Sequence, residues 1–194
     1  MADRAAATHP RGGPPLPDKV VAIHEALRNA KIPHALGGAL ALAYYAEPRA
    51  TIDIDLNVFV PTDRWEDVVG ALVPLGVRAD GLDTAALLRD GQCRLWWGDN
   101  PVDLFFAYDA IHVEMRKETR RLPFADETLP FLGPEHLAVC KAMLDRPKDW
   151  IDIEQMLLSE EEFEAGKVED WLERMVGSDD LRLQRLRELS APPG

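Results

Sequence analysis

The segment TIDIDLNVFV, residues 51–60, alternates polar and apolar side chains: Thr51, Asp53, Asp55 and Asn57 are separated by isoleucine and leucine. A period of two predicts a strand with one polar and one apolar face. Alternate side chains of a strand point the same way, with Cα atoms about 7 Å apart. The sequence therefore predicts that Asp53 and Asp55 lie side by side on one face.

This pair of carboxylates predicts a metal site. Two like charges on a strand otherwise rich in apolar residues repel each other, and burial increases the cost. A divalent cation removes that penalty, and carboxylate oxygens suit Mg²⁺ or Mn²⁺. We therefore expect Asp53 and Asp55 to hold Mg²⁺ (or Mn²⁺) as the cofactor.

A glycine pair precedes this strand. Gly37 and Gly38 stand between a short predicted strand, residues 34–36, and a helix-prone segment, residues 39–46. Backbone amides at a helix N-terminus favour an anion, and glycine allows a close approach. Alone, Gly-Gly is most simply a tight turn. Together with the Asp-x-Asp strand, it predicts a phosphate site beside the metal.

A third acid, Asp103, lies on a predicted strand at residues 102–107, among apolar neighbours. Two interpretations stay open for it. Either Asp103 joins Asp53 and Asp55 in one cluster, or it faces solvent at the start of its strand.

The rest of the chain predicts a mixed protein that becomes helical toward its C-terminus. Helices are predicted at residues 18–30, 62–75 and 83–89, strands at 92–97, 121–124 and 128–132, and helices again from Pro134 onward. The predicted fold class is α/β (α+β), a small mixed β-sheet flanked by helices. We divide the chain into a flexible tail (1–17), an α/β domain (18–133) and a helical C-terminal subdomain (134–194).

Charge and composition exclude some classes of function. The 194 residues include 22 Lys and Arg against 34 Asp and Glu, a net charge of −12. Such a balance argues against broad DNA or RNA binding, which depends on cationic phosphate contacts. No apolar run is long enough for a membrane span, and no signal peptide is recognised, so we expect a cytoplasmic protein. Cys93 and Cys140 have no metal-binding spacing and are expected to be structural thiols.

These motifs resemble a known family. Gly37-Gly38-Ala39, Arg49-x-Thr51-x-Asp53-x-Asp55-Leu56 and Asp103 look like the DNA polymerase β-type nucleotidyltransferase superfamily, and are most similar to its branch of AbiEii-like minimal nucleotidyltransferase toxins. The later segment Lys141-x-x-x-x-Arg146-x-Lys148-Asp149-x-x-Asp152-Ile153 is similar to a helix signature of that branch. The resemblance covers roughly residues 20–158.

The resemblance implies a nucleotidyltransferase fold and a metal-dependent transfer of an NMP from an NTP. It implies that Asp53 and Asp55 hold the metal ions and that Asp103, as third carboxylate and metal ligand, helps to activate the acceptor hydroxyl. The nucleotide-binding residues that it implies are Gly37, Gly38, Arg49, Thr51, Lys141 and Arg146. The acceptor would be an RNA end, a protein or a small molecule such as an antibiotic, and a toxin role with an antitoxin partner is suggested.

One position departs from the family pattern. Many active members have Gly-Ser at the turn, where the hydroxyl assists triphosphate binding, whereas this chain has Gly38-Ala39. Only backbone amides remain there. This leaves open the alternative of a catalytically inactive nucleotide- or partner-binding module with the same fold.

Overall fold

A computed structural model describes residues 13–159 and 163–191. The helices are α1 (Leu16–Asn29), α2 (Gly38–Leu42), η1 (Thr62–Arg64), α3 (Trp65–Leu72), η2 (Val73–Leu75), α4 (Thr84–Asp90), α5 (Ala110–Lys117), α6 (Pro134–Leu144), α7 (Pro147–Ser159), α8 (Ala165–Val176) and α9 (Leu181–Ser190). The strands are β1 (His34–Leu36), β2 (Ile54–Pro61), β3 (Gln92–Trp97), β4 (Asn100–Ala107), β5 (Arg120–Phe124) and β6 (Glu127–Phe131).

The six strands of the described residues form one mixed sheet in the order β3-β4-β2-β1-β6-β5. β2 pairs parallel with β4 and antiparallel with β1, and β1 pairs parallel with β6. The pairs β3–β4 and β5–β6 are antiparallel hairpins. The predicted fold class, a small mixed sheet flanked by helices with a helical C-terminal part, is confirmed.

Strand β2 lies inside the sheet and carries the alternation expected from the sequence. Its apolar face is completely buried at Ile54, Leu56 and Val58. The strand begins at Ile54, later than residue 51, because residues before it form a local turn in which the Thr51 hydroxyl accepts a hydrogen bond from the Asp53 amide at 3.1 Å. Asp53 therefore precedes the strand, and Asp55 lies in it.

Several helices differ from their predictions. The predicted helix 62–75 is divided into η1, α3 and η2, α4 is shifted by one residue from 83–89, and α5 was not predicted. α1 begins at Leu16 rather than Asp18, with Pro15 as its N-cap; residues 1–12 of the predicted tail lie outside the described residues. α2 ends at Leu42 instead of Ala46, because the chain tightens there: the amides of Tyr44 and Tyr45 donate to carbonyls three residues back. These differences leave the order of the predicted elements unchanged.

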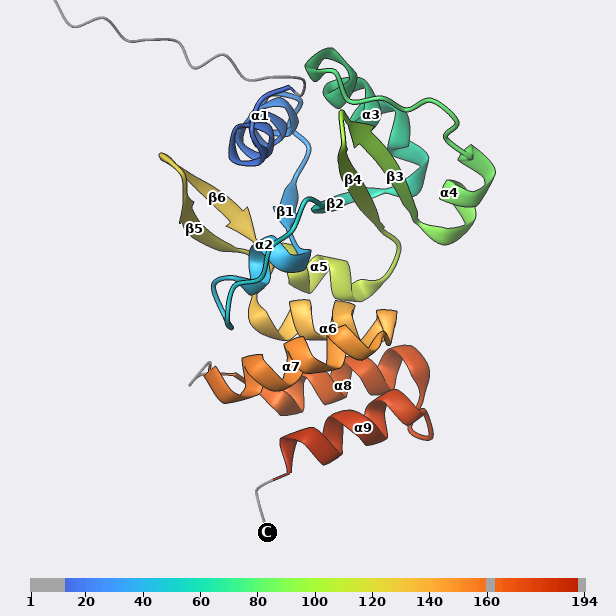
Figure 1. The fold of residues 1–194 in the computed structure, drawn as a ribbon. Coiled ribbons are helices and arrows are strands. Elements are labelled where there is room, and N and C mark those ends of the chain that lie inside the picture. Colours follow the sequence, from blue (N-terminus) through green and yellow to red (C-terminus); the bar gives the residue numbers. More distant parts are fainter. Residues whose placement is uncertain (1–12, 160–162, 192–194) are drawn as a thin grey trace, which may run out of the picture.

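The C-terminal helices α6 to α9 lie together at one end of the molecule. Helices α2 and α5 lie between them and the sheet (Figure 1). Trp150 of α7 is among the largest fully buried side chains. No described helix combines the length and the apolar character that a membrane crossing requires. The arrangement places α6 and α7 opposite the strands that carry the aspartates.

Candidate active site

The turn at Gly37 and Gly38 packs against Asp55 of β2. Gly38 has a φ of +55°, and a Cβ added to it would lie 1.8 Å from Oδ2 of Asp55. The amide of Gly37 donates to the Asp55 carbonyl at 2.9 Å. Only glycine combines this left-handed backbone with so close an approach. The turn therefore holds the Asp55 carboxylate at the N-terminus of α2.

The third acid lies next to this carboxylate. Asp55 of β2 and Asp103 of β4 are directly paired in the parallel register, and Asp53 precedes β2 by one residue. Burial, followed by the charges of Asp103 and Asp53, raises the pKa of Asp55 to about 6. The three aspartates predicted from the sequence are thus brought together, and the interpretation of Asp103 as a solvent-facing residue is wrong.

Asp103 has a partner that the motifs did not indicate. Arg94 of β3 donates to both Asp103 oxygens, with Nε–Oδ1 and Nη2–Oδ2 distances of 2.7 Å. The Arg94 side chain is 53% exposed and that of Asp103 is 15% exposed. Arg94 thus occupies both carboxylate oxygens of Asp103 in this structure. Of the two side chains, Arg94 is the one exposed to solvent.

A second charged cluster faces the aspartates from the helical part. Lys141 of α6 donates to Oδ2 of Asp152 at 2.6 Å, and Arg49 donates to the same oxygen at 3.3 Å. Arg146 donates to both oxygens of Asp149, at 2.6 and 3.0 Å. Three cations share two carboxylates, so this cluster has a formal surplus of one positive charge.

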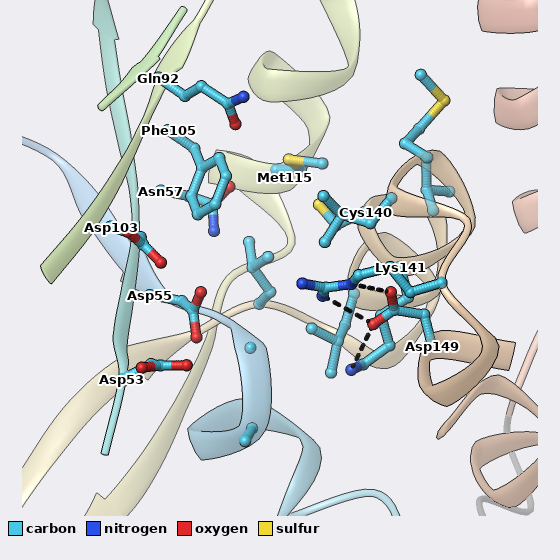
Figure 2. A pocket seen from close by; sticks show the side chains of 18 of the residues that line it. Asp53, Asp55, Asn57, Gln92, Asp103, Phe105, Met115, Cys140, Lys141 and Asp149 are labelled. Atoms are coloured by element: carbon cyan, nitrogen blue, oxygen red, sulfur yellow. Dashed lines mark hydrogen bonds and ion pairs between the residues drawn. The ribbon is translucent and has the colours of Figure 1, made fainter. Parts of the chain in front are cut away.

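Both clusters border one cavity of about 310 Å³. Figure 2 shows Asp53, Asp55 and Asp103 on one side of it and Lys141 and Asp149 on the other. Of the residues predicted from sequence, the cavity is lined by Gly38, Arg49, Thr51, Asp53, Asp55, Asp103, Lys141 and Arg146. Gly37 is absent from this lining and acts through its amide on Asp55.

The donor set fits a divalent cation in part. Asp53 has no ion-pair partner among the described residues, and the raised pKa of Asp55 shows that a nearby positive charge would stabilise its anion. Within residues 13–159 and 163–191, however, no three His, Cys, Asp or Glu side chains are arranged to hold a metal ion. Asp53 and Asp55 could hold the ion as they stand, whereas Asp103 could join them only after Arg94 releases it.

The two thiols are not candidate nucleophiles. Cys140 lines the cavity, but burial raises its pKa to about 12. Burial likewise raises the pKa of Cys93 to about 12. Both cysteines are free and would stay protonated near neutral pH, since the thiolate is the nucleophilic form.

Several polar and aromatic lining residues were not singled out as site residues from the sequence, among them Asn57, Gln92, Arg94 and Phe105. Arg94 and Gln92 had a usable signal. A two-residue turn at Gly98-Asp99 makes Trp97 and Asn100 the first pair of the β3–β4 hairpin, and counting back from it pairs Arg94 with Asp103. Asn57 continues the polar face of residues 51–60, so the same period of two places it on the face that carries Asp55.

Comparison with known proteins supports the architecture. No family model and no curated protein matches the sequence. The solution structure of the antibiotic-resistance factor ANT(2'')-Ia is similar, with a TM-score of 0.58, 20% identity and coverage of 82% of this chain and 90% of that one. The crystal structure of ANT(2'')-Ia with adenylyl-2''-tobramycin has a TM-score of 0.58, 18% identity and coverage of 90% and 98%.

A third solved structure is the lincosamide antibiotic adenylyltransferase LnuA, lincomycin-bound, with a TM-score of 0.49, 13% identity and coverage of 72% of this chain and 94% of that one. At 20% and 18% identity, the likeness to ANT(2'')-Ia shows the fold alone. The chain has the nucleotidyltransferase fold seen in ANT(2'')-Ia.

Proposed function

We propose that this protein transfers an NMP from an NTP to an acceptor hydroxyl, with Mg²⁺ (or Mn²⁺) as cofactor. The observation that carries the proposal is the meeting of Asp55, Asp103 and the Gly38 turn at one edge of the cavity. Phosphoryl-type transfer depends on positioning and charge neutralisation around an in-line displacement. Carboxylates on one side of the cavity and cations on the other provide both.

Each part of the site has a role in this proposal. Asp53 and Asp55 would hold the metal ion, which supplies positive charge to the α-phosphate. The amides at the start of α2 approach the phosphates, and Lys141 and Arg146 face them from across the cavity with the surplus charge of their cluster. Arg49 and Thr51 complete the nucleotide side of the lining.

The proposed reaction balances without another reactant. The acceptor oxygen forms a bond to the α-phosphorus, and the bond from that phosphorus to the bridging oxygen of the β-phosphate breaks. Pyrophosphate leaves with that electron pair, and the hydroxyl proton passes to Asp103, once Arg94 has moved away from it. The products are an acceptor phosphodiester and pyrophosphate.

A small-molecule acceptor is the version that the observations favour. The similar structure of ANT(2'')-Ia is that of an antibiotic-resistance factor and contains adenylyl-2''-tobramycin. The cavity of about 310 Å³ is at the lower end of the usual range for small-ligand sites. An RNA or protein acceptor, the AbiEii-like branch, an antitoxin partner and a cytoplasmic location stay predictions from the sequence.

Two observations favour the alternative of a binding module without catalysis. Arg94 holds both oxygens of Asp103, and Ala39 supplies no hydroxyl at the turn. In that case the cavity would bind nucleotide and leave the acceptor unmodified. The two functions share the fold and differ in whether label reaches an acceptor.

The test incubates the protein with each α-labelled NTP and Mg²⁺ or Mn²⁺, with total RNA, protein extract and small hydroxyl compounds as acceptors. We expect transfer by the wild type and none by Asp53→Asn/Asp55→Asn. Nucleotide binding without transfer to any acceptor would favour the binding module.

Stability of the double variant is the control. Without metal it should be as stable as the wild type or more so, because repulsion is relieved. A large loss of melting temperature in EDTA would mean that the pair is structural.

A further inference from the structure

The cavity continues past the aspartates into a part lined mainly by neutral side chains. Asn57 follows Asp55 by two residues on β2, and Phe105 follows Asp103 by two residues on β4, so all four share one face of the sheet. Gln92 of β3 pairs with Phe105. Figure 2 shows Asn57, Phe105 and Gln92 together, with Met115 and Cys140 facing them from α5 and α6. We call these five residues the neutral end.

Asn57 has an unusual environment for a buried amide. The residue is 5% exposed and lines the cavity, and its side chain makes no hydrogen bond with another residue in the described part of the chain. Its polar atoms open into the cavity, because the fully enclosed side-chain atoms without a partner in the described residues are those of His136. A carboxamide that opens into a cavity binds either water or a ligand there. The Gln92 carboxamide, which is exposed at the same end, also has no protein partner among the described residues. The neutral end therefore presents amide groups that a ligand can pair.

The charges around the cavity cancel. Five acidic residues line it, Asp53, Asp55, Asp90, Asp103 and Asp149, and five basic residues line it, Arg49, Arg94, Lys141, Arg146 and Lys148. The net charge of −12 therefore does not extend into the cavity.

Two of the acids nearest the neutral end are paired with arginines, and the third, Asp55, would hold the metal ion in the proposed function. Asp103 is held by Arg94, and Asp90 accepts two hydrogen bonds from Arg89. With a metal ion on Asp55, an amine entering between Phe105 and Met115 would lose water without gaining a free carboxylate, which is unfavourable. A neutral group carries no such cost.

The reaction geometry assigns this end to the acceptor. The attacking and leaving oxygens lie in line across the transferred phosphorus. The pyrophosphate would leave toward the Gly38 turn and the cations Lys141 and Arg146. The acceptor would approach from the side of Asp103, where the neutral end begins.

We propose that the neutral end binds the acceptor, and that this acceptor is an uncharged, partly apolar hydroxyl compound rather than a polycation. Phe105 and Met115 contact its apolar part, and the carboxamides of Asn57 and Gln92 bind its polar groups. This inference rests on the proposed function.

The test measures binding of two probes to the full chain by calorimetry. The neutral probe is 4-nitrophenyl β-D-glucopyranoside, and the cationic probe is tobramycin. Phe105→Glu and Gln92→Glu add one charge each to the neutral end, and Gln92 is exposed, so its replacement does not threaten folding. Val113→Glu is the matched control, since this α5 residue is 54% exposed and does not line the cavity.

We expect the wild type to bind the neutral probe more tightly than tobramycin. Each cavity variant should weaken neutral-probe binding by at least about tenfold and strengthen tobramycin binding, with the control unchanged. Tighter binding of tobramycin by the wild type, or no binding of the neutral probe, would overturn the inference.

Nucleotide binding and label transfer are measured on the same proteins. If the cavity variants weaken Mg²⁺–NTP binding as much as probe binding, this end holds the nucleobase and the inference is wrong. Failure of nucleotide binding or transfer in the wild type would instead count against the proposed function, independently of the probe preference.

Discussion

The ammonium of Lys141 lies 2.6 Å from Oδ2 of Asp152, and the two side chains are only 4% and 6% exposed. The pair joins α6 to α7 at the wall of the cavity, and Asp149 lies 4.0 Å from the same ammonium. Arg49 also donates to this Asp152 oxygen, at 3.3 Å, but the 2.6 Å pair is the closer and more buried contact for both side chains, so it supplies most of their charge compensation.

Asp152→Asn should therefore destabilise the protein by up to about 3–5 kcal/mol, the usual cost of a buried charge left without its partner, because Lys141 keeps only the more distant Asp149. Chemical denaturation measures this loss. Asp67→Asn is the matched control, because Asp67 pairs with Arg64 on the surface and its loss should cost about 1 kcal/mol or less. Equal effects of the two substitutions would show that the buried pair contributes no more than a surface pair.

Gly38→Ala should remove both stability and nucleotide binding. The new methyl group would collide with the Asp55 carboxylate, and a φ of +55° is strained for alanine, at about 1–3 kcal/mol. Gly70→Ala is the control, since this α3 glycine has open space around its Cα, and alanine there should stabilise the helix by up to about 1 kcal/mol. Denaturation and Mg²⁺–NTP titration follow the two variants; full nucleotide binding by Gly38→Ala would contradict the arrangement of the turn.

Arg94→Gln should lower the Mg²⁺ concentration needed for half-maximal nucleotide binding, because Asp103 is freed to join the metal ligands. Its effect on stability should stay within about 1 kcal/mol, as for other exposed pairs. Arg64→Gln, which removes a surface arginine of similar exposure, should leave the Mg²⁺ requirement unchanged. An unchanged requirement in Arg94→Gln would mean that Asp103 does not reach the metal.

The buried pair His24–His34 predicts a pH dependence of stability. The ring nitrogens Nδ1 of His24 and Nε2 of His34 lie 2.9 Å apart, and burial lowers the pKa of His34 from 6.5 to about 4. The unfolded chain then binds a proton that the folded chain does not. The free energy of unfolding should fall as pH drops from 6.5 to about 4, by about 3 kcal/mol from this residue.

Denaturation curves at pH 7 and pH 4 measure this term as the difference between the wild type and His34→Gln. The wild type should lose more stability on acidification than the variant. Equal losses in both proteins would show that His34 titrates normally in the folded state.

The sequence predicts the strand of residues 51–60 because its alternation marks the two faces directly, and the helix-rich C-terminal third is equally plain. The start of that strand, residues 51–53, was predicted wrongly. The Thr51 hydroxyl accepts a hydrogen bond from the Asp53 amide, and the alternation of polar and apolar residues does not reveal this local contact. Register across β2 and β4 depends on a long crossover between them, so the pairing of Asp55 with Asp103 was not readable from either strand alone.

The candidate site was predicted unevenly for the same reason. Asp53, Asp55 and Gly38 are close in sequence, and local pattern sufficed for them. Lys141 and Arg146 came only from the family resemblance, since nothing local places α6 opposite β2. Arg94, the ion-pair partner of Asp103, could be identified only from the register of the β3–β4 hairpin.

The central claim is nucleotidyl transfer, and paired labels test it most directly. The wild type is incubated with Mg²⁺, a neutral hydroxyl acceptor and an NTP labelled on either the α- or the γ-phosphate. We expect α-label on the acceptor, γ-label in pyrophosphate in equal amount, and neither with Asp53→Asn/Asp55→Asn. Label from the γ-phosphate on the acceptor, or equal transfer by the double variant, would contradict the account.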